Sequence, residues 1–526
     1  MSSFIKADID DAALAEASID YLVASKAASR LREGDATLWG KAAAAEASER
    51  LGWVSAASDI VDVIAQGEEL CTKLSTIDYS RVLLCGMGGS SLAPQVMTND
   101  SPIPLIAIDS IHPDFIDATM SPESLAQSVV IVSSKSGGTS ETRTQLAICE
   151  DRMSKAGINA AERIIVITDP DSELEEHARL RGYKTILGHP HVGGRYSALT
   201  VFGMIPAMVA GAKLDEVAPS VFQTVRALSR DSADNPAIRV ASALKIAVER
   251  SGTAQFFSPE LPGLPAWIEQ LVAESTGKDG RGLLPIARTS KTVTQTGGMV
   301  VHLREHETSA SGLDADADAE MTVTGPLGVH FYFWEVVTSL LCMLLEVNPF
   351  DQPDVERTKR AARGMKPGDL LSANVTEPCE GLEVTVGLSK AKPETLDALL
   401  TEFIGAANGA AYVVIQAFLP ERSEALETLA KTVELRSGTP ATVSYGPSYL
   451  HSTGQLHKGG QPGGLFLSVY QKAAHDVRVP GTITSLGWLC ETAAMADQKV
   501  LRGLDRQLMA LRVANTKVLS LLAQHL

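Results

Sequence analysis

The chain has 526 residues, more than one ordinary folding unit needs, so two or three domains are expected. Hydrophobic residues make up 45% and charged residues 21% of the sequence, which argues against both a disordered chain and a membrane protein. The formal net charge of -17, with no lysine- or arginine-rich run, disfavours nucleic acid and membranes as partners. An anionic ligand would therefore need a locally positive pocket.

The N-terminus and the cysteines both predict a cytoplasmic protein. Residues 1–22 are acidic and have neither the basic flank nor the continuous apolar stretch of a secretory signal. The six cysteines are scattered without CxxC spacing, which fits reduced thiols better than a disulfide or zinc framework.

The first predicted elements are helices within residues 12–74, which have apolar side chains at three- and four-residue spacing and should wrap the first domain. From residue 81, short apolar runs alternate with helical stretches; the runs are RVLLCG, PLIAID, SVVIVSS, RIIVITD and YKTILG. This alternation predicts an α/β fold with parallel strands and crossover helices. Ligands of such sheets bind where the carboxyl ends of the strands enter loops, so candidate site residues are sought there.

Two further units follow. The runs TAQFFS and MVVHL among helical stretches predict a second α/β domain, and the strands AAYVVIQAFL and ATVSYG with a long amphipathic helix to the C-terminus predict an α/β extension. The predicted division is an N-terminal helical segment (1–75), a first domain (76–225), a second domain (226–365) and a C-terminal extension (366–526).

The first candidate loop is Gly86-Met87-Gly88-Gly89-Ser90-Ser91, between the apolar run RVLLC and a helix. Glycines let a ligand approach the backbone, and the free N–H groups of a helix N-terminus attract anions. Such turns occur in many folds, so a tight turn without a ligand is an equal alternative for this loop alone.

A second loop strengthens the anion-site interpretation. The run SVVIVSS leads into Ser134-Lys135-Ser136-Gly137-Gly138-Thr139-Ser140-Glu141-Thr142 and then a helix. Hydroxyls, glycines and a lysine at this position supply the donors that a phosphate monoester requires. The alternative is that serine and threonine only cap the helix.

Other ligands fit less well. Asp109 lies where a ribose-binding acid of a dinucleotide site would lie, but Ser91 replaces the third glycine of that fingerprint, and no Walker lysine motif occurs. His302 and His306 match an HxxEH metal pattern that needs a helix, whereas this segment is predicted as a strand entering a loop. The acidic stretch with Asp314, Asp316 and Asp318 lacks the glycine and glutamate of a calcium loop. No metal and no cofactor is expected.

The two loops resemble the sugar-isomerase (SIS) modules of the glucose-6-phosphate isomerase family, and three further motifs occur in the family order. They are Gly193-Gly194-Arg195-Tyr196-Ser197, Glu274-Ser275-Thr276-Gly277-Lys278, and Asn348-Pro349-Phe350-Asp351-Gln352-Pro353 through Lys359. The region after 365, with GPSYLHSTGQLHKGG, is similar to the isomerase portion of fused transaldolase/isomerase proteins. The resemblance implies two SIS-type domains with parallel sheets, a homodimer with the site at the subunit interface, and a functional link to transaldolase.

The resemblance also implies a phosphate site. Ser134, Ser136 and Thr139 would bind the substrate phosphate, Ser90 would contribute from the first loop, and Lys135 would add positive charge. Gly88, Gly89 and Glu141 would support these loops.

Four residues are implied in catalysis. Glu274 would move the proton between C1 and C2, Arg195 would hold the developing enediolate, and Lys359 would lie near the ring oxygen. The ring-opening histidine would be His451, although its stretch is one residue shorter than in the family and follows the lysine motif. His330 stands in the family's chain order but lies in an apolar stretch that predicts a buried helix, and it is the weaker candidate.

The resulting hypothesis is an aldose-ketose isomerase that interconverts glucose 6-phosphate and fructose 6-phosphate. Isomerisation of mannose 6-phosphate or a heptose phosphate is an alternative that depends on the pocket at C2. A non-catalytic sugar-phosphate sensor is another, which the presence of Glu274 and Arg195 disfavours.

Overall fold

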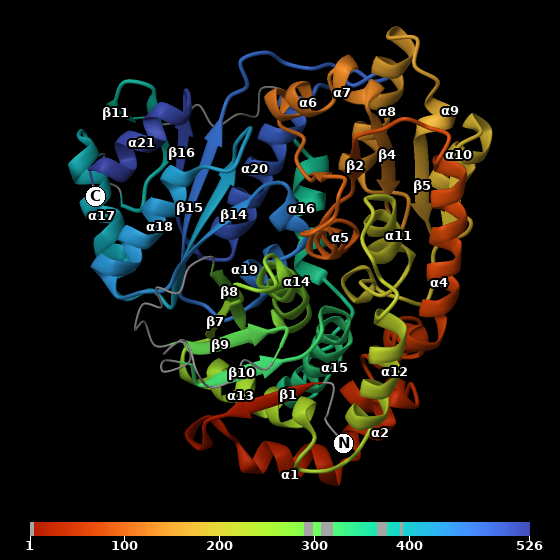
Figure 1. Ribbon diagram of the computed structural model, residues 1–526. Coiled ribbons are helices and arrows are strands. Elements are labelled where there is room, and N and C mark those ends of the chain that lie inside the picture. The colour runs from red at the N-terminus through yellow and green to blue at the C-terminus, as the bar shows by residue number, and fades with distance from the viewer. Residues whose placement is uncertain (1–4, 289–297, 307–318, 366–375, 390–392, 526) are drawn as a thin grey trace.

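The computed structural model describes residues 5–288, 298–306, 319–365, 376–389 and 393–525 and contains three β-sheets flanked by helices (Figure 1). The first sheet is wholly parallel, in the order β3-β2-β4-β5-β6. Its strands are β2 (Arg81–Cys85), β3 (Leu105–Ile108), β4 (Ser128–Ser133), β5 (Ile164–Thr168) and β6 (Lys184–Leu187). All five were predicted from the alternating apolar runs, and the α/β fold class is confirmed.

Helices cover both faces of this sheet, which is why its strands are apolar at consecutive positions. In β4, Val129 and Ile131 pack in a core with α11 (Val201–Val209), whereas Val130 and Val132 pack in a second core with α8 (Ser140–Lys155). The second core also contains Tyr449 and other residues of the C-terminal region. The last part of the chain therefore packs directly against the first sheet.

The second sheet, in the order β1-β10-β9-β7-β8, corrects the prediction for the N-terminal segment. Its strands are β1 (Lys6–Ile9), β7 (Thr253–Phe257), β8 (Leu284–Arg288), β9 (Met299–Arg304) and β10 (Met321–Thr324), and β1 pairs antiparallel with β10. The segment is therefore not wholly helical. After β1, α1 (Glu16–Ala24) packs on α13 (Pro236–Arg250) and α15 (Leu327–Leu345) beside the second sheet, while α4 (Trp53–Leu74) contacts α11 beside the first.

Among the described residues, α15 is the one helix long and apolar enough to cross a membrane by length and composition. Within its most apolar window, 89% of the residues are buried inside the protein. This degree of burial is typical of a core helix, and α15 packs against α12 (Val217–Leu228), α13 and α14 (Leu264–Thr276).

The third sheet, formed by the C-terminal region, has the order β11-β12-β16-β15-β13-β14. Its strands are β11 (Thr376–Cys379), β12 (Leu382–Val386), β13 (Tyr412–Phe418), β14 (Ala441–Tyr445), β15 (Gly464–Gln471) and β16 (Gln507–Val513). The predicted long C-terminal helix is wrong: α20 (Leu486–Gly503) ends before β16, and α21 (Thr516–Gln524) follows it. β16 pairs with β12 on one side and with β15 on the other, so it is an interior strand, and this long-range pairing overrides the local helical pattern.

The remaining helices complete the layers around the three sheets. They are η1 (Asp11–Ala13), α2 (Ala27–Arg32), η2 (Ala36–Trp39), α3 (Ala44–Ser48), α5 (Leu92–Met97), α6 (Pro113–Thr119), α7 (Pro122–Ala126), α9 (Ala160–Arg163), α10 (Glu173–Arg181), α17 (Leu396–Ala407) and α18 (Glu424–Ser437).

Two short helices of the C-terminal region bring the three parts of the chain together (Figure 1). The 3-10 turn η5 (Ser448–His451) contacts η3 (Gly88–Ser90) at the end of β2. The next helix, α19 (Gly454–Gly459), packs against both α14 and α16 (Pro353–Arg363). The candidate site lies where these elements meet.

Candidate active site

The first glycine-rich loop packs tightly against two other segments of the candidate site. Gly88 has a φ of +56°, and a Cβ atom there would lie 2.6 Å from the carbonyl oxygen of His451. A Cβ atom at Gly89 would overlap the carbonyl oxygen of Gly194. Glycine is therefore required here for close approach of the backbones, and Ser90 is buried in the same turn.

The second loop presents hydroxyl groups at the N-terminus of α8. Ser136 is exposed and Thr139 is half-buried, whereas Ser134 is buried and its Oγ donates a hydrogen bond to Thr139 Oγ1 at 3.2 Å. Thr139 is the N-cap residue of the 16-residue helix α8, but its side chain makes no capping hydrogen bond. The first N–H groups of α8 and these hydroxyls can therefore bind an anion.

Lys135 departs from its expected role at the phosphate. Its Nζ donates to both carboxylate oxygens of Asp169, at 2.6 and 2.8 Å, and to the carbonyl oxygen of His189 at 2.7 Å. An ammonium group has three donors, and all three are used in these contacts. Lys135 therefore ties the second loop to the loops that follow β5 and β6, and we do not retain it as a direct phosphate ligand.

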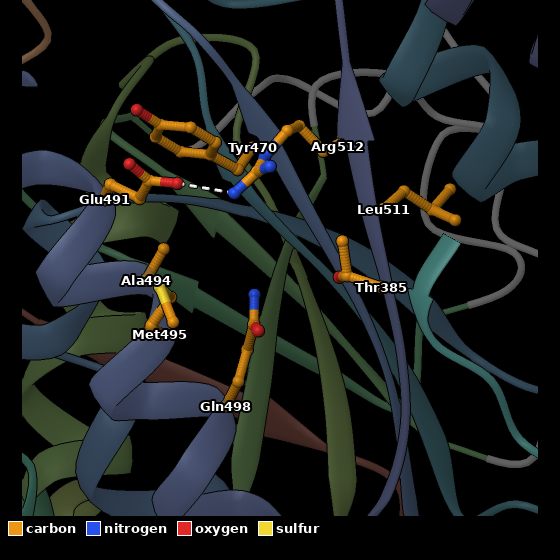
Figure 2. Close-up of a pocket in the computed structure, with 8 residues that line it drawn as sticks. All are labelled: Thr385, Tyr470, Glu491, Ala494, Met495, Gln498, Leu511 and Arg512. Atoms are coloured by element: carbon orange, nitrogen blue, oxygen red, sulfur yellow. Dashed lines mark hydrogen bonds and ion pairs between the residues drawn. The ribbon is translucent and has the colours of Figure 1, made fainter. Parts of the chain in front are cut away.

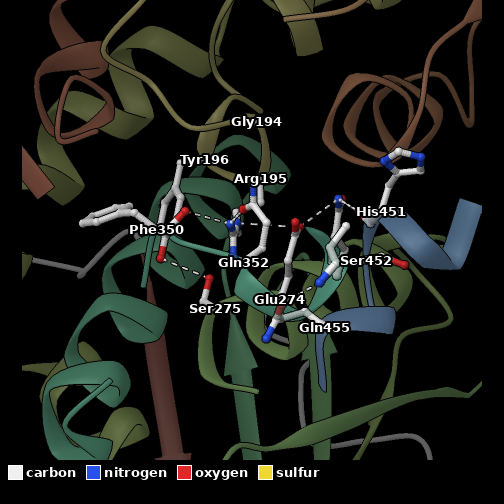
Figure 3. Close-up of polar contacts among 12 residues, drawn as sticks. Gly194, Arg195, Tyr196, Glu274, Ser275, Phe350, Gln352, His451, Ser452 and Gln455 are labelled. Carbon is white, nitrogen blue, oxygen red and sulfur yellow. Dashed lines mark hydrogen bonds and ion pairs between the residues drawn. The ribbon is translucent and has the colours of Figure 1, made fainter. Parts of the chain in front are cut away.

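Arg195 lies in η4 (Gly194–Tyr196), and its guanidinium is buried beside Glu274 (Figure 3). Its Nε is 3.6 Å from Glu274 Oε2, and its Nη2 donates to the carbonyl oxygen of Phe350 and to the side chain of Gln352. The third nitrogen, Nη1, is buried and has no hydrogen-bond partner among the described residues. A buried charged donor without a partner is costly, so this nitrogen is suited to an oxygen atom of a ligand.

Glu274 lies near the C-terminal end of α14, where only 11% of its side chain is exposed. Gln270, one turn earlier on the same helix, has its Nε2 3.5 Å from Glu274 Oε2 and donates to the carbonyl oxygen of His451 at 2.9 Å. The carboxylate is therefore held between a guanidinium and an amide. It has the chemistry of a general base next to positive charge.

His451, at the end of η5, forms an ion pair with Glu141 in the first turn of α8. The distance from His451 Nε2 to Glu141 Oε1 is 3.2 Å. Burial alone would lower the pKa of His451, but the charge and hydrogen bond of Glu141 outweigh it, so the pKa lies above its ordinary value of 6.5. Burial would raise the pKa of Glu141, but interaction with His451 lowers it to about 2. The favoured state is an imidazolium paired with a carboxylate.

The other two candidate catalytic residues, Lys359 and His330, differ in how far they are buried. Lys359, on α16, is half-exposed and pairs with Glu356 at 2.7 Å, and its charge lies close enough to His451 to oppose protonation of the imidazole. His330 is fully buried at the start of α15, where its Nε2 lies 2.9 Å from the carbonyl oxygen of Arg304. Burial lowers the pKa of His330 to about 4, which leaves it neutral in the core beside the second sheet.

The HxxEH segment begins on a strand and continues beyond its end, as the sequence predicted. His302 is buried on β9, whereas His306 follows the strand and is exposed. Among the described residues, no group of three or more histidine, cysteine, aspartate or glutamate side chains could hold a metal ion. The acidic stretch with Asp314, Asp316 and Asp318 lies outside the described residues.

Sequence reasoning assigned no role to three glutamines that line this region: Gln270, Gln352 and Gln455. The last two lie inside motifs that the sequence analysis quoted, but nothing in their local pattern indicates their contacts with residues 100 to 178 positions away. Gln270 was more accessible to prediction, because an (i, i+4) spacing places it on the same helix face as Glu274.

No family model matches the chain, but curated sequences and solved structures do. A glucose-6-phosphate isomerase from Cyanothece sp. is 32% identical over 216 residues, which are 38% of this chain and 40% of that protein. One from Parabacteroides distasonis is 26% identical over 382 residues, which are 59% of this chain and 85% of that protein.

A crystal structure of a glucose-6-phosphate isomerase from Chlamydia trachomatis matches 69% of this chain and 88% of its own, with a TM-score of 0.53 and 16% identity. The structural match shows that this chain shares the fold of that glucose-6-phosphate isomerase. The sequence matches show that the chain is similar to curated glucose-6-phosphate isomerases along more than half of its length.

Proposed function

We propose that this protein interconverts glucose 6-phosphate and fructose 6-phosphate by moving a proton between C1 and C2. The single observation that carries this proposal is the pairing of Glu274 with Arg195, whose buried Nη1 lacks a partner among the described residues. Aldose-ketose isomerisation needs a carboxylate that removes and returns a proton, and fixed positive charge where the enediolate oxygen forms.

In the proposed mechanism, the ring of the substrate opens first. The His451 imidazolium, held by Glu141 at Nε2, would donate a proton to the ring oxygen, while the C1 hydroxyl passes its proton to solvent water and the C1–O5 bond breaks. Because Nε2 is engaged by Glu141, the substrate would meet Nδ1. The half-exposed Lys359 would add positive charge near the ring oxygen.

Proton transfer would follow in the open chain. Glu274 would remove the proton from C2 of the aldose, the C1 carbonyl would become the enediolate oxygen, and Arg195 would stabilise its negative charge. Transfer of the C2 hydroxyl proton to the C1 oxygen and delivery of a proton from the Glu274 carboxyl to C1 would complete the ketose. Exchange of that carboxyl proton with solvent before delivery would place solvent hydrogen at C1. The net reaction moves two hydrogens within the substrate and requires no oxidant.

The phosphate would bind at the N-terminus of α8. Ser136 and Thr139 would donate hydrogen bonds from their accessible hydroxyls, while Ser134 would act through Thr139, to which it donates. Ser90 would contribute from the buried first turn, whose glycines hold it against the Arg195 segment.

Location and assembly are proposed from the cysteines and from the family resemblance. The described cysteines are all free thiols, in keeping with the cytoplasm. A homodimer and a functional link to transaldolase rest on the family resemblance alone. Sedimentation of the purified protein tests the first of these.

The decisive experiment is an assay of the purified protein, without added metal, on glucose, mannose and fructose 6-phosphates in deuterated water. We expect interconversion of the glucose and fructose esters with incorporation of solvent deuterium at the transferred position. Turnover of mannose 6-phosphate alone would favour the alternative substrate class. Tight binding of all three esters without turnover would favour a sugar-phosphate sensor.

A further inference from the structure

Gln455, on α19 of the C-terminal region, is fully buried between two helices that carry proposed catalytic residues (Figure 3). Its Nε2 donates to the carbonyl oxygen of Gly277 at 2.9 Å and to Asp354 Oδ2 at 2.8 Å. Its Oε1 accepts from the backbone N–H groups of Asp354 and Val355, at 3.0 and 3.3 Å. All four hydrogen-bonding positions of the amide are therefore used.

These contacts join the ends of α14 and α16. Gly277 is the residue that follows α14, three positions beyond Glu274, and Asp354 and Val355 lie in the first turn of α16, which also carries Lys359. The residue at the N-cap of α16, Gln352, makes no capping hydrogen bond, because its side chain accepts from Arg195 instead. Gln455 supplies the missing cap from another part of the chain.

The fit around Gln455 is close on every side. A Cβ atom at Gly459, one turn later on α19, would lie 2.6 Å from the carbonyl oxygen of Gly277 and would overlap Asp354 Oδ2. The same turn of α19 is anchored by Lys458, whose Nζ forms a fully buried ion pair with Asp497 on α20 at 2.6 Å. The amide of Gln455 therefore has little freedom, and neither do the two helix ends that it contacts.

We propose that Gln455 is a positioning residue that sets the distance and orientation of Glu274 relative to the Gln352–Arg195 pair and Lys359. This inference rests on the proposed isomerase function. The amide does not touch substrate. It acts through the two helix ends, so that the distances between the base and the cationic groups are kept during proton transfer. A displacement of about 1 Å at a reacting group can cost up to roughly a hundredfold in rate.

The test is Gln455→Glu, which keeps the size of the side chain and its acceptors. The new carboxylate cannot donate to Gly277 and would face the carboxylate of Asp354. We expect kcat to fall at least about tenfold, with KM within about threefold of wild type, because the proposed phosphate hydroxyls lie on another loop. All rates are expressed per folded molecule, measured by circular dichroism and thermal unfolding.

Gln498→Glu is the matched control. Gln498 is also a buried amide of the C-terminal region, on α20, where its Nε2 donates to Ser468 at 2.9 Å beside a small cavity of about 20 Å³ (Figure 2). The control carries the same chemical change at a buried amide whose hydrogen bond goes to Ser468 and not to α14 or α16, and it should retain the kcat of wild type. Equal losses of kcat in the two variants would overturn the proposal.

A second substitution separates positioning from simple destabilisation. Adding Asp354→Asn to Gln455→Glu replaces the facing carboxylate with an amide that can donate to the carboxylate introduced at position 455. On a logarithmic scale, we expect the double variant to recover at least about half of the loss in kcat. If Gln455→Glu does not fold, Gln455→Asn decides, because it keeps the donors and acceptor on a shorter stem. That variant should lose at least about threefold in kcat, and a wild-type kcat in it would overturn the proposal.

The outcomes distinguish this inference from the proposed function. A wild-type protein that does not isomerise glucose 6-phosphate contradicts the function itself. An active wild type together with folded Gln455 variants of unchanged kcat contradicts only the positioning role.

Discussion

The imidazole Nε2 of His451 lies 3.2 Å from the carboxylate of Glu141, although 310 positions separate the two residues in the chain. His451 ends a 3-10 turn of the C-terminal region, and Glu141 lies in the first turn of the helix after β4 in the first sheet. The pair therefore joins the proposed ring-opening group to the proposed phosphate loop. Its electrostatics lead to the first prediction.

Glu141→Gln should shift the pH dependence of kcat/KM. In the wild type, Glu141 raises the pKa of His451, so the imidazolium persists above pH 6.5 and is lost as the pH rises through the raised pKa. Without the carboxylate, the effect of burial dominates and the pKa falls. The alkaline limb should therefore move to lower pH, with a loss of roughly tenfold or more at pH 8. Glu173→Gln, which removes an exposed carboxylate on α10, is the control. An unmoved alkaline limb would remove His451 from the role of proton donor.

Glu274→Gln should retain the fold and sugar-phosphate binding while nearly abolishing isomerisation. Glutamine matches glutamate in size, but its amide cannot accept and return a proton at neutral pH. A positioned general base supplies about two to four powers of ten, so we expect a loss of at least roughly a hundredfold in kcat. Exchange of the substrate C2 hydrogen with deuterated water should fall in parallel. A folded variant that keeps more than about a tenth of wild-type turnover would show that another carboxylate, Glu141 first, is the base.

The double variant Ser136→Ala and Thr139→Ala should raise KM by about tenfold or more and change kcat by less than about threefold. Hydrogen bonds to a phosphate are made alike in the ground state and the transition state, so their loss weakens both equally. Steady-state kinetics with fructose 6-phosphate measure this. Thr432→Ala, a hydroxyl deletion on α18, serves as the control. An unchanged apparent affinity in the double variant would place the phosphate elsewhere.

Activity should persist after treatment with EDTA, because the proposed mechanism uses only side chains of this chain. The assay compares treated and untreated enzyme at saturating substrate. Complete loss of turnover that zinc restores would instead direct attention to His302 and His306.

Local sequence was sufficient to predict the two candidate loops. An apolar strand, a run of glycines and hydroxyls, and a helix are contiguous in the chain, so β2 with Gly86–Ser91 and β4 with Ser134–Thr142 were predictable without tertiary contacts. The same local reading failed for β15 and β16. Their residues form short apolar runs near helical segments, and such runs become strands only through pairing with distant partners.

The convergence of the site was decided by tertiary structure. The motifs of Arg195, Glu274 and His451 could each be found along the chain, but only packing of η3 against η4, η5 and α14 brings the three segments together. The charge state of His451 depends on Glu141, and the cap of α16 depends on Gln455, which lies about a hundred positions further along the chain. Electrostatic and hydrogen-bonding interactions depend on distance in space, and separation along the chain does not determine that distance. The sequence alone therefore determined which chemical groups are present, and the fold decided which of them act together.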